Sequence, residues 1–262
     1  MLQYFLTHRF LLWQFTKRQI LEQYQGSFFG LGWTLIAPLL MLLVLTFVFN
    51  GIFKLKWPNS EALGMMGFAL HVFIGMLIFN FFADLIGRAP GLILGNTNLV
   101  TKVIFPLPII ALSQVLSSSV NLLAMLSVLI LFTFWIHTLS FALFQLPIIL
   151  LALLVFMLGL TLFFAALGVY FRDLKQINAL LASLLMFLSP VFYPVSSIPA
   201  EYVSLYMSNP LAQFMEMART IIVDGQWVPL KEVVVVWGIS VMTLIVGLFT
   251  FKKLKRGFAD VL

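Results

Sequence analysis

Long uncharged stretches dominate this chain of 262 residues, and short polar segments interrupt them at wide intervals. A helix needs about 20 apolar residues to cross a hydrocarbon core of about 30 Å. The pattern therefore predicts an all-α integral membrane protein with six transmembrane helices, folded as one domain over residues 1–262. The expected spans are residues 28–53, 62–83, two helices within 103–171 that turn near 135–140, 176–194 and 233–251.

The first 22 residues mix apolar and basic positions and predict a helix that lies on the membrane surface. One helical face can collect most of the apolar side chains. These are Leu2, Phe5, Leu6, Leu12, Trp13 and Ile20. Arg9 falls inside that face, and a loosely ordered basic tail remains the alternative interpretation.

Residues 88–102 connect the second and third expected spans and are too short to cross a membrane. Pro90 and Gly91 end the preceding helix, and residues 92–94 are apolar. One interpretation is a short cytoplasmic helix that presents an apolar knob to a partner protein. The other is an ordinary connection packed under the helix bundle, and the segment alone does not separate the two.

Residues 195–229 are too polar for a span, yet they carry helical patterns. Asn209 provides a cap and Pro210 a first helical residue, and apolar side chains follow at helical spacing. Glu216 and Arg219 lie three residues apart on the opposite face, where they could pair. We expect two amphipathic helices over about 199–223, at the external surface and dipping toward the membrane. A solvent-exposed hairpin is the alternative.

Basic residues set the expected orientation. The six spans place eleven Lys and Arg residues on the side of the termini and four on the other, which accounts for all 15. Cytoplasmic loops carry such an excess, so both termini are expected in the cytoplasm. The net charge of +6 fits this topology and contact with membrane phospholipids, and we expect no nucleic-acid binding.

Composition agrees with a membrane protein and limits its chemistry. The chain is 62% hydrophobic and 9% charged, with a mean hydropathy of +1.10, whereas soluble domains carry about 25% charged residues. We expect no catalytic, cofactor or metal site, because mid-span carboxylates, cysteines and a phosphate-binding loop are all lacking. Asp84 lies one turn before Arg88 and can pair with it, and the isolated His71 and His137 are expected to serve helix packing. Any pumping would need a nucleotide bound by another polypeptide.

Several motifs resemble one family in consistent order along nearly the whole chain. They are the segment 18–33 followed by Pro38, the pattern Asn96-x2-Leu99-x2-Lys102-x2-Phe105-Pro106, residues 170–175 followed by Ser189-Pro190 and Tyr193, Asn209-Pro210, and Phe258-Ala-Asp260. Together they resemble the type-2 permeases of ABC transporters that export polysaccharides. The O-antigen export permeases are the most similar group, and capsule and teichoic-acid permeases are near relatives.

The resemblance implies a homodimer in the bacterial inner membrane, paired with two copies of an ABC ATPase that binds ATP and Mg. The implied substrate is a lipid-linked polysaccharide, commonly carried on undecaprenyl pyrophosphate. Residues 1–22 would be the interface helix, and 199–223 the gate helices. The implied functional residues are Arg88, Leu92, Asn96 and Lys102 for ATPase coupling, Arg172, Asp173 and Lys175 at the cytoplasmic channel mouth, and Tyr193, Pro210, Phe214, Glu216 and Arg219 in the gate region. A type-2 permease for a drug-like or lipid substrate and a membrane scaffold without transport activity remain alternatives.

Overall fold

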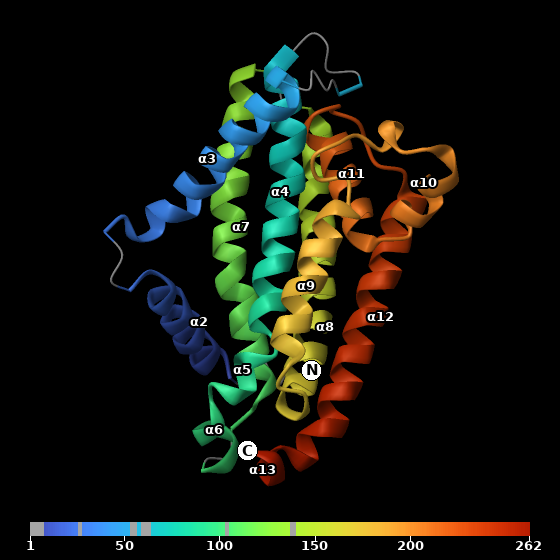
Figure 1. Ribbon diagram of the computed structural model, residues 1–262. Helices are drawn as coiled ribbons and strands as arrows, with labels where there is room; N and C mark the ends of the chain where they lie inside the picture. The colour runs from blue at the N-terminus through green and yellow to red at the C-terminus, as the bar shows by residue number, and fades with distance from the viewer. Residues whose placement is uncertain (1–7, 26–27, 53–56, 59–63, 103–104, 137–139) are drawn as a thin grey trace.

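A computed structural model describes residues 8–25, 28–52, 57–58, 64–102, 105–136 and 140–262. The described residues form helices and turns, and no strand occurs among them. Within these ranges, four helices are long and apolar enough to cross a membrane. They are α4 (Gly64–Arg88), α7 (Pro108–Ile136), α8 (Leu146–Tyr170) and α12 (Leu230–Leu254), and they run along one common direction (Figure 1). The predicted all-α membrane fold is thus confirmed.

Two glycines bring α8 and α12 into backbone contact. A Cβ atom on Gly247 would lie 2.1 Å from the carbonyl oxygen of Gly159. A Cβ atom on Gly159 would in turn lie 2.6 Å from the backbone of Thr243. Small residues allow such close packing where no hydrophobic effect drives helices together in lipid. The two helices therefore associate along their length with no side chain between them at this crossing.

Two further apolar helices are shorter than the predicted spans. Helix α3 (Trp33–Thr46) continues into the π-helical turn η2 (Phe47–Ile52) and slants away from the bundle (Figure 1). Helix α9 (Leu174–Phe187) has 14 residues, about 21 Å at about 1.5 Å per residue. The span predicted over 176–194 therefore ends early as a helix. Pro190 explains this, because the α conformation is disfavoured for the residue before a proline.

Short helices gather at the end of the bundle where α4 finishes. Helix α2 (Arg9–Tyr24) packs against α7 at this end. The short helices α5 (Gly91–Leu94) and α6 (Thr97–Thr101), which follow α4 in the chain, lie at the same end. The C-terminal elements η6 (Lys255–Gly257) and α13 (Phe258–Val261) lie at the same end (Figure 1). The helix predicted over residues 1–22 is present from Arg9, and residues 1–7 lie outside the described ranges.

The opposite end of the bundle carries a helical hairpin. Helices α10 (Ala200–Met207) and α11 (Pro210–Ile222) follow the single turn η5 (Val195–Ser197), as the sequence pattern predicts. A second turn, η4 (Phe141–Gln145), lies nearby. The side chain of Gln145 donates to the carbonyl of Val228 (2.9 Å) and accepts from its N–H (2.8 Å). This pair fixes the connection into α12.

Candidate functional site

The predicted coupling segment 88–102 forms two short helices below α4. Arg88 is the last residue of α4, and its Nε atom lies 2.6 Å from Oδ1 of Asp84, so the predicted ion pair is confirmed. Asn96 is half-buried and donates from its amide to the carbonyl of Leu92 (2.9 Å). Lys102 is exposed directly after α6. The segment is ordered by local hydrogen bonds, and its coupling role stays a prediction.

The side chain of Leu92 lies in the core, which corrects the idea of an exposed apolar knob. Leu92 is 8% exposed and Ile93 is fully buried, and both join a second hydrophobic cluster beneath the bundle. Burial of these apolar side chains against α7 and α8 lowers the free energy of the folded protein. The exposed residues of the segment are glycines or carry polar side chains, and these side chains belong to Arg88, Asn98, Thr101 and Lys102.

Close contacts tie this segment to its neighbours. A Cβ atom on Gly168 of α8 would lie 2.3 Å from the carbonyl oxygen of Pro90, so the turn after α4 rests directly on the α8 backbone. The rings of Phe15 and Phe105 lie 5.1 Å apart and join α2 to the start of α7. In the C-terminal segment, Phe258 is fully buried and α13 contacts α6. A displacement of residues 88–102 would therefore act directly on α8 and α13.

The predicted channel-mouth residues lie in the turn between α8 and α9 and, in the case of Lys175, in the first turn of α9. Arg172, Asp173 and Lys175 are all exposed. In the part of the chain that the structure describes, no salt bridge joins Arg172 to Asp173. The backbone carbonyl of Asp173 accepts the N–H groups of Gln176 (3.0 Å) and Ile177 (3.2 Å), which starts α9. The turn thus presents three charged side chains to solvent.

Sequence reasoning missed Asn178, which fastens α9 to α4. Its amide donates to the carbonyl of Ile86 (2.8 Å), and the residue is fully buried. In a helix this carbonyl would accept the N–H of the residue four positions later, but that residue is Pro90, which has none. Asn178 supplies the missing donor to a buried acceptor. A lone Asn in an apolar helix, together with Pro90, was the signal in the sequence.

At the other end of the bundle, the turn between α10 and α11 fixes the position of the hairpin. The side chain of Asn209 accepts the N–H of Leu211 (3.0 Å) and donates to the hydroxyl of Ser189 (2.8 Å), so the predicted cap before Pro210 is confirmed. Tyr193 donates to the carbonyl of Phe187 (2.5 Å). These bonds join the hairpin to the turn that follows α9.

Helix α11 is buried along most of its length and is more enclosed than an amphipathic surface helix. Phe214 is 1% exposed, and its ring lies 5.9 Å from that of Phe156 in α8. Arg219 of the predicted polar face points inward and is only 2% exposed, whereas Glu216 is 32% exposed. The placement of Arg219 on an outer polar face is therefore wrong.

Arg219 satisfies its buried guanidinium within the protein. Its Nη1 atom lies 2.6 Å from Oε1 of Glu216, which confirms the predicted pair. Its Nε and Nη2 atoms donate to the carbonyl of His71 (3.2 and 3.1 Å), and Nη2 also donates to the carbonyl of Val191 (3.2 Å). One side chain thus joins α11 to the middle of α4 and to the turn after α9. A buried charge is tolerated only when it is paired and hydrogen-bonded in this way.

An aromatic ring covers the same guanidinium. The Cζ atom of Arg219 lies 4.5 Å from the ring centre of Trp57, which also stacks on His71 at 4.6 Å. His71 serves helix packing, as expected. Gly75 leaves room for the cluster, because a Cβ atom there would lie 2.8 Å from both Arg219 Nη2 and the carbonyl oxygen of Val191. Sequence reasoning missed Trp57 and Gly75, since neither stands near Arg219 in the chain.

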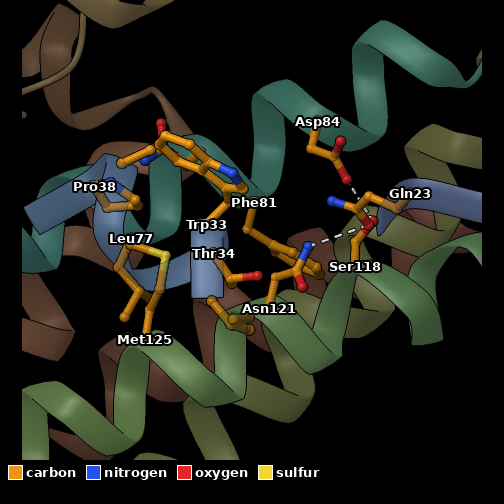
Figure 2. A pocket seen from close by; sticks show the side chains of 13 residues that line it. Gln23, Trp33, Thr34, Pro38, Leu77, Phe81, Asp84, Ser118, Asn121 and Met125 are labelled. Carbon is orange, nitrogen blue, oxygen red and sulfur yellow. Dashed lines mark hydrogen bonds between the residues drawn. The ribbon is translucent and has the colours of Figure 1, made fainter. Parts of the chain in front are cut away.

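A cavity of about 490 Å³ opens between α2, α3, α4 and α7. Figure 2 shows Asp84, Ser118, Asn121 and Gln23 gathered on one side of it, with Pro38, Leu77 and Met125 on the other. The hydroxyl of Ser118 donates to Oδ2 of Asp84 (2.6 Å). Among the described residues, no three His, Asp or Glu side chains group as metal ligands would.

Comparison with known proteins places these features in a family context. Residues 11–223 match the family described as ABC-2 type transporter. The chain is similar to an O-antigen export system permease protein RfbA of Klebsiella pneumoniae (26% identical, covering 96% of this chain and 95% of that protein). It is also similar to a protein of the same name in Myxococcus xanthus (29%; 97% and 95%) and to the polysialic acid transport protein KpsM of Escherichia coli (23%; 79% and 79%).

Proposed function

Because this chain belongs to the ABC-2 type transporter family, we propose that it is the permease subunit of an exporter for an O-antigen-like polysaccharide. The observation that carries this proposal is similarity over at least 95% of both chains to permeases named for O-antigen export. Similarity to a polysialic acid transport protein supports the same substrate class. The polymer is attached to a lipid carrier and crosses the bacterial inner membrane.

The energy comes from a separate ATPase, of which two copies bind ATP and Mg. This chain has no phosphate-binding loop of its own, so hydrolysis has to occur on a partner. The end of the bundle that carries α5, α6 and α13 receives the ATPase, through the exposed side chains of Asn98, Thr101 and Lys102. The contacts of Pro90 with α8 and of Phe105 with α2 pass the displacement into the membrane helices.

The functional unit is a homodimer in which the two short helices meet the second copy. Helix α9 exposes an apolar stripe of Ile177, Leu180, Leu184 and Phe187. Helix α3 exposes Leu39, Leu40 and Leu43, and Phe47 at the start of η2 is exposed as well. These apolar faces provide a water-free route for the carrier lipid. The glycan moves through an adjacent passage, and the exposed charges of Arg172, Asp173 and Lys175 lie at the cytoplasmic end of that passage.

The chain crosses the membrane six times, with both termini in the cytoplasm. The four long helices provide four of the crossings. Helix α3 with its π-helical turn provides another, and α9 contributes to the remaining one. Since α9 is about 21 Å long and the hydrocarbon core about 30 Å thick, the hairpin of α10 with the buried helix α11 completes the fifth crossing from the outer side. This hairpin gates the outer mouth, and Arg219 is the residue that holds it on α4.

Deletion of the encoding gene tests the function. Lipid-linked glycan should accumulate on the cytoplasmic side, and export should return only when this chain is supplied together with its ATPase. A deletion strain that exports normally and accumulates no glycan would contradict the proposal. A type-2 permease for a drug-like or lipid substrate is the alternative, and it predicts altered drug or lipid efflux with unchanged glycan export.

A further inference from the structure

The cavity between α2, α3, α4 and α7 has an amphipathic wall. Its polar side carries the amides of Gln23 and Asn121 together with Asp84 and Ser118, and the amide of Asn80 also lines the cavity. Its volume of about 490 Å³ falls in the range of about 300–1,000 Å³ that is usual for small-ligand sites. Trp33, which is 44% exposed, lies between the polar and apolar sides in Figure 2. A flat ring and several amides therefore face one space.

The negative charge of Asp84 in the cavity wall is already neutralised, and this determines which class of ligand fits the cavity. Both oxygens of Asp84 are occupied, Oδ1 by Arg88 (2.6 Å) and Oδ2 by Ser118 (2.6 Å). The carboxylate therefore needs no cationic ligand. Among the described residues that line the cavity, none is Lys or Arg, and the neighbouring Arg88 is already paired with Asp84, so the lining offers a phosphate no cation of its own. The wall favours an uncharged molecule.

Amide side chains suit hydroxyl groups in particular. Each amide has an oxygen that accepts and an NH2 group that donates, which matches a hydroxyl group that does both. Asn80 is exposed at the rim, and no hydrogen bond to its side chain occurs within the described part of the chain. The Asn121 amide donates to Oε1 of Gln23 at 3.4 Å, so these two amides lie side by side in the wall.

We propose that this cavity is a binding site for a single uncharged sugar ring, stacked on Trp33 and hydrogen-bonded by Asn80, Asn121 and Gln23. The apolar face of a sugar ring packs on an indole, while its hydroxyls reach the amides. The α4 residues of the site lie one to three turns from the end of the helix that carries Arg88, about 5–16 Å along its axis. The sugar belongs either to the exported glycan, an identity that rests on the proposed function, or to a membrane glycolipid.

The seam between α3, α4 and α7 continues beyond this site as an apolar crevice. This second space, of about 100 Å³, is lined by Leu39, Leu42, Phe73 and Phe132 among others. A ligand with a sugar head and a hydrocarbon chain would thus find apolar surface directly above the head. An unattached sugar would use only the first cavity.

Sugar binding is measured on the full-length chain in nanodiscs by saturation-transfer difference NMR. The probes are methyl glycosides of common hexoses and N-acetylhexosamines, a neutral monoglucosyl diacylglycerol in the bilayer, and inorganic pyrophosphate. The variants are Trp33→Leu and Asn80→Ala. Their matched controls are Trp227→Leu and Gln226→Ala, exposed residues outside the cavity. Thermal unfolding of every variant shows that it is folded.

We expect at least one glycoside to bind, with affinity reduced about tenfold or more in Trp33→Leu and Asn80→Ala and unchanged in both controls. Tighter binding of the glycolipid would assign the sugar to a membrane lipid, and tighter binding of a glycoside to the glycan. Equal affinity in all variants, or binding of pyrophosphate alone, would overturn the proposal. So would the absence of sugar binding by a wild-type chain that restores export in the deletion strain, a result that leaves the proposed function intact.

Discussion

The Cζ atom of Arg219 lies 4.5 Å from the ring centre of Trp57, so a charge carried by α11 rests on an aromatic ring that precedes α4. The ring also stacks on His71, and the three side chains close the inner side of the hairpin. All three are buried. The position of the hairpin therefore depends on residues from three separate parts of the sequence.

Trp57→Leu should loosen this arrangement. The variant loses the cation–π contact, worth about 2 kcal/mol at a desolvated site, and the stacking on His71. We expect a lower apparent melting temperature of the purified protein and reduced export. Trp227→Leu removes an exposed tryptophan and should leave both unchanged. Equal melting temperatures for the two variants would show that Trp57 does not hold Arg219.

Glu216→Gln should also weaken the attachment of the hairpin to α4. The substitution removes the negative partner of a guanidinium that is 2% exposed, and breaking a buried pair costs about 3–5 kcal/mol; Glu216 is itself 32% exposed, so the smaller value applies. Thermal unfolding should detect this loss. Glu201→Gln, on the exposed surface of α10, is the control. A Glu216→Gln protein as stable as this control would mean that the carbonyls of His71 and Val191 suffice.

Gly247→Ala should separate α8 from α12. The added Cβ atom would lie 2.1 Å from the carbonyl oxygen of Gly159, and neither backbone can yield without moving a helix. We expect a marked loss of folded protein after extraction in detergent, measured by size-exclusion chromatography. Gly238→Ala in the same helix meets nothing within 4 Å and should be neutral or stabilising, by up to about 1 kcal/mol.

Leu92→Asp and Lys102→Glu should fail for different reasons. Aspartate at the buried position 92 puts a carboxylate into an apolar cluster, so we expect a destabilised protein with a low melting temperature. Lys102→Glu changes an exposed charge after α6, so the fold should be kept while ATP-driven export falls. Melting curves and export measured on the same preparations separate the two effects. Full export by Lys102→Glu would remove that residue from the coupling surface.

Asn178→Leu should detach α9 from the lower end of α4. The carbonyl of Ile86 would lose the Asn178 amide as its donor while Pro90 offers no N–H, and a buried unsatisfied acceptor costs about 1–3 kcal/mol. The melting temperature should fall, and Gln176→Leu on the exposed face should not change it. A wild-type melting temperature for Asn178→Leu would imply that water replaces the amide.

The sequence predicted those parts of the fold that lipid imposes. Long uncharged stretches have to become helices in a membrane, because no water satisfies their backbone groups. The cap at Asn209 and the ion pairs of Asp84 with Arg88 and Glu216 with Arg219 were also predictable, since each involves residues within one helical turn. The lengths of α3 and α9 were not, because hydrophobicity alone does not show where a helix stops.

The burial of Arg219 and Leu92 lay beyond prediction for a different reason. Arg219 stands on the polar face of α11, and only its distant partners, the carbonyls of His71 and Val191, make that face an interior one. Leu92 is enclosed by α8, to which it has no pattern-based relation. Contacts between residues far apart in the chain leave no periodic trace in a single sequence.

The direct backbone contact between Gly159 and Gly247 also has a mechanical meaning. Because no side chain separates the two backbones at this crossing, a displacement of α8 there would carry α12 with it. Helices α3 and α9 are short and expose apolar faces, so we expect these two helices to be the elements that move against the α8–α12 pair.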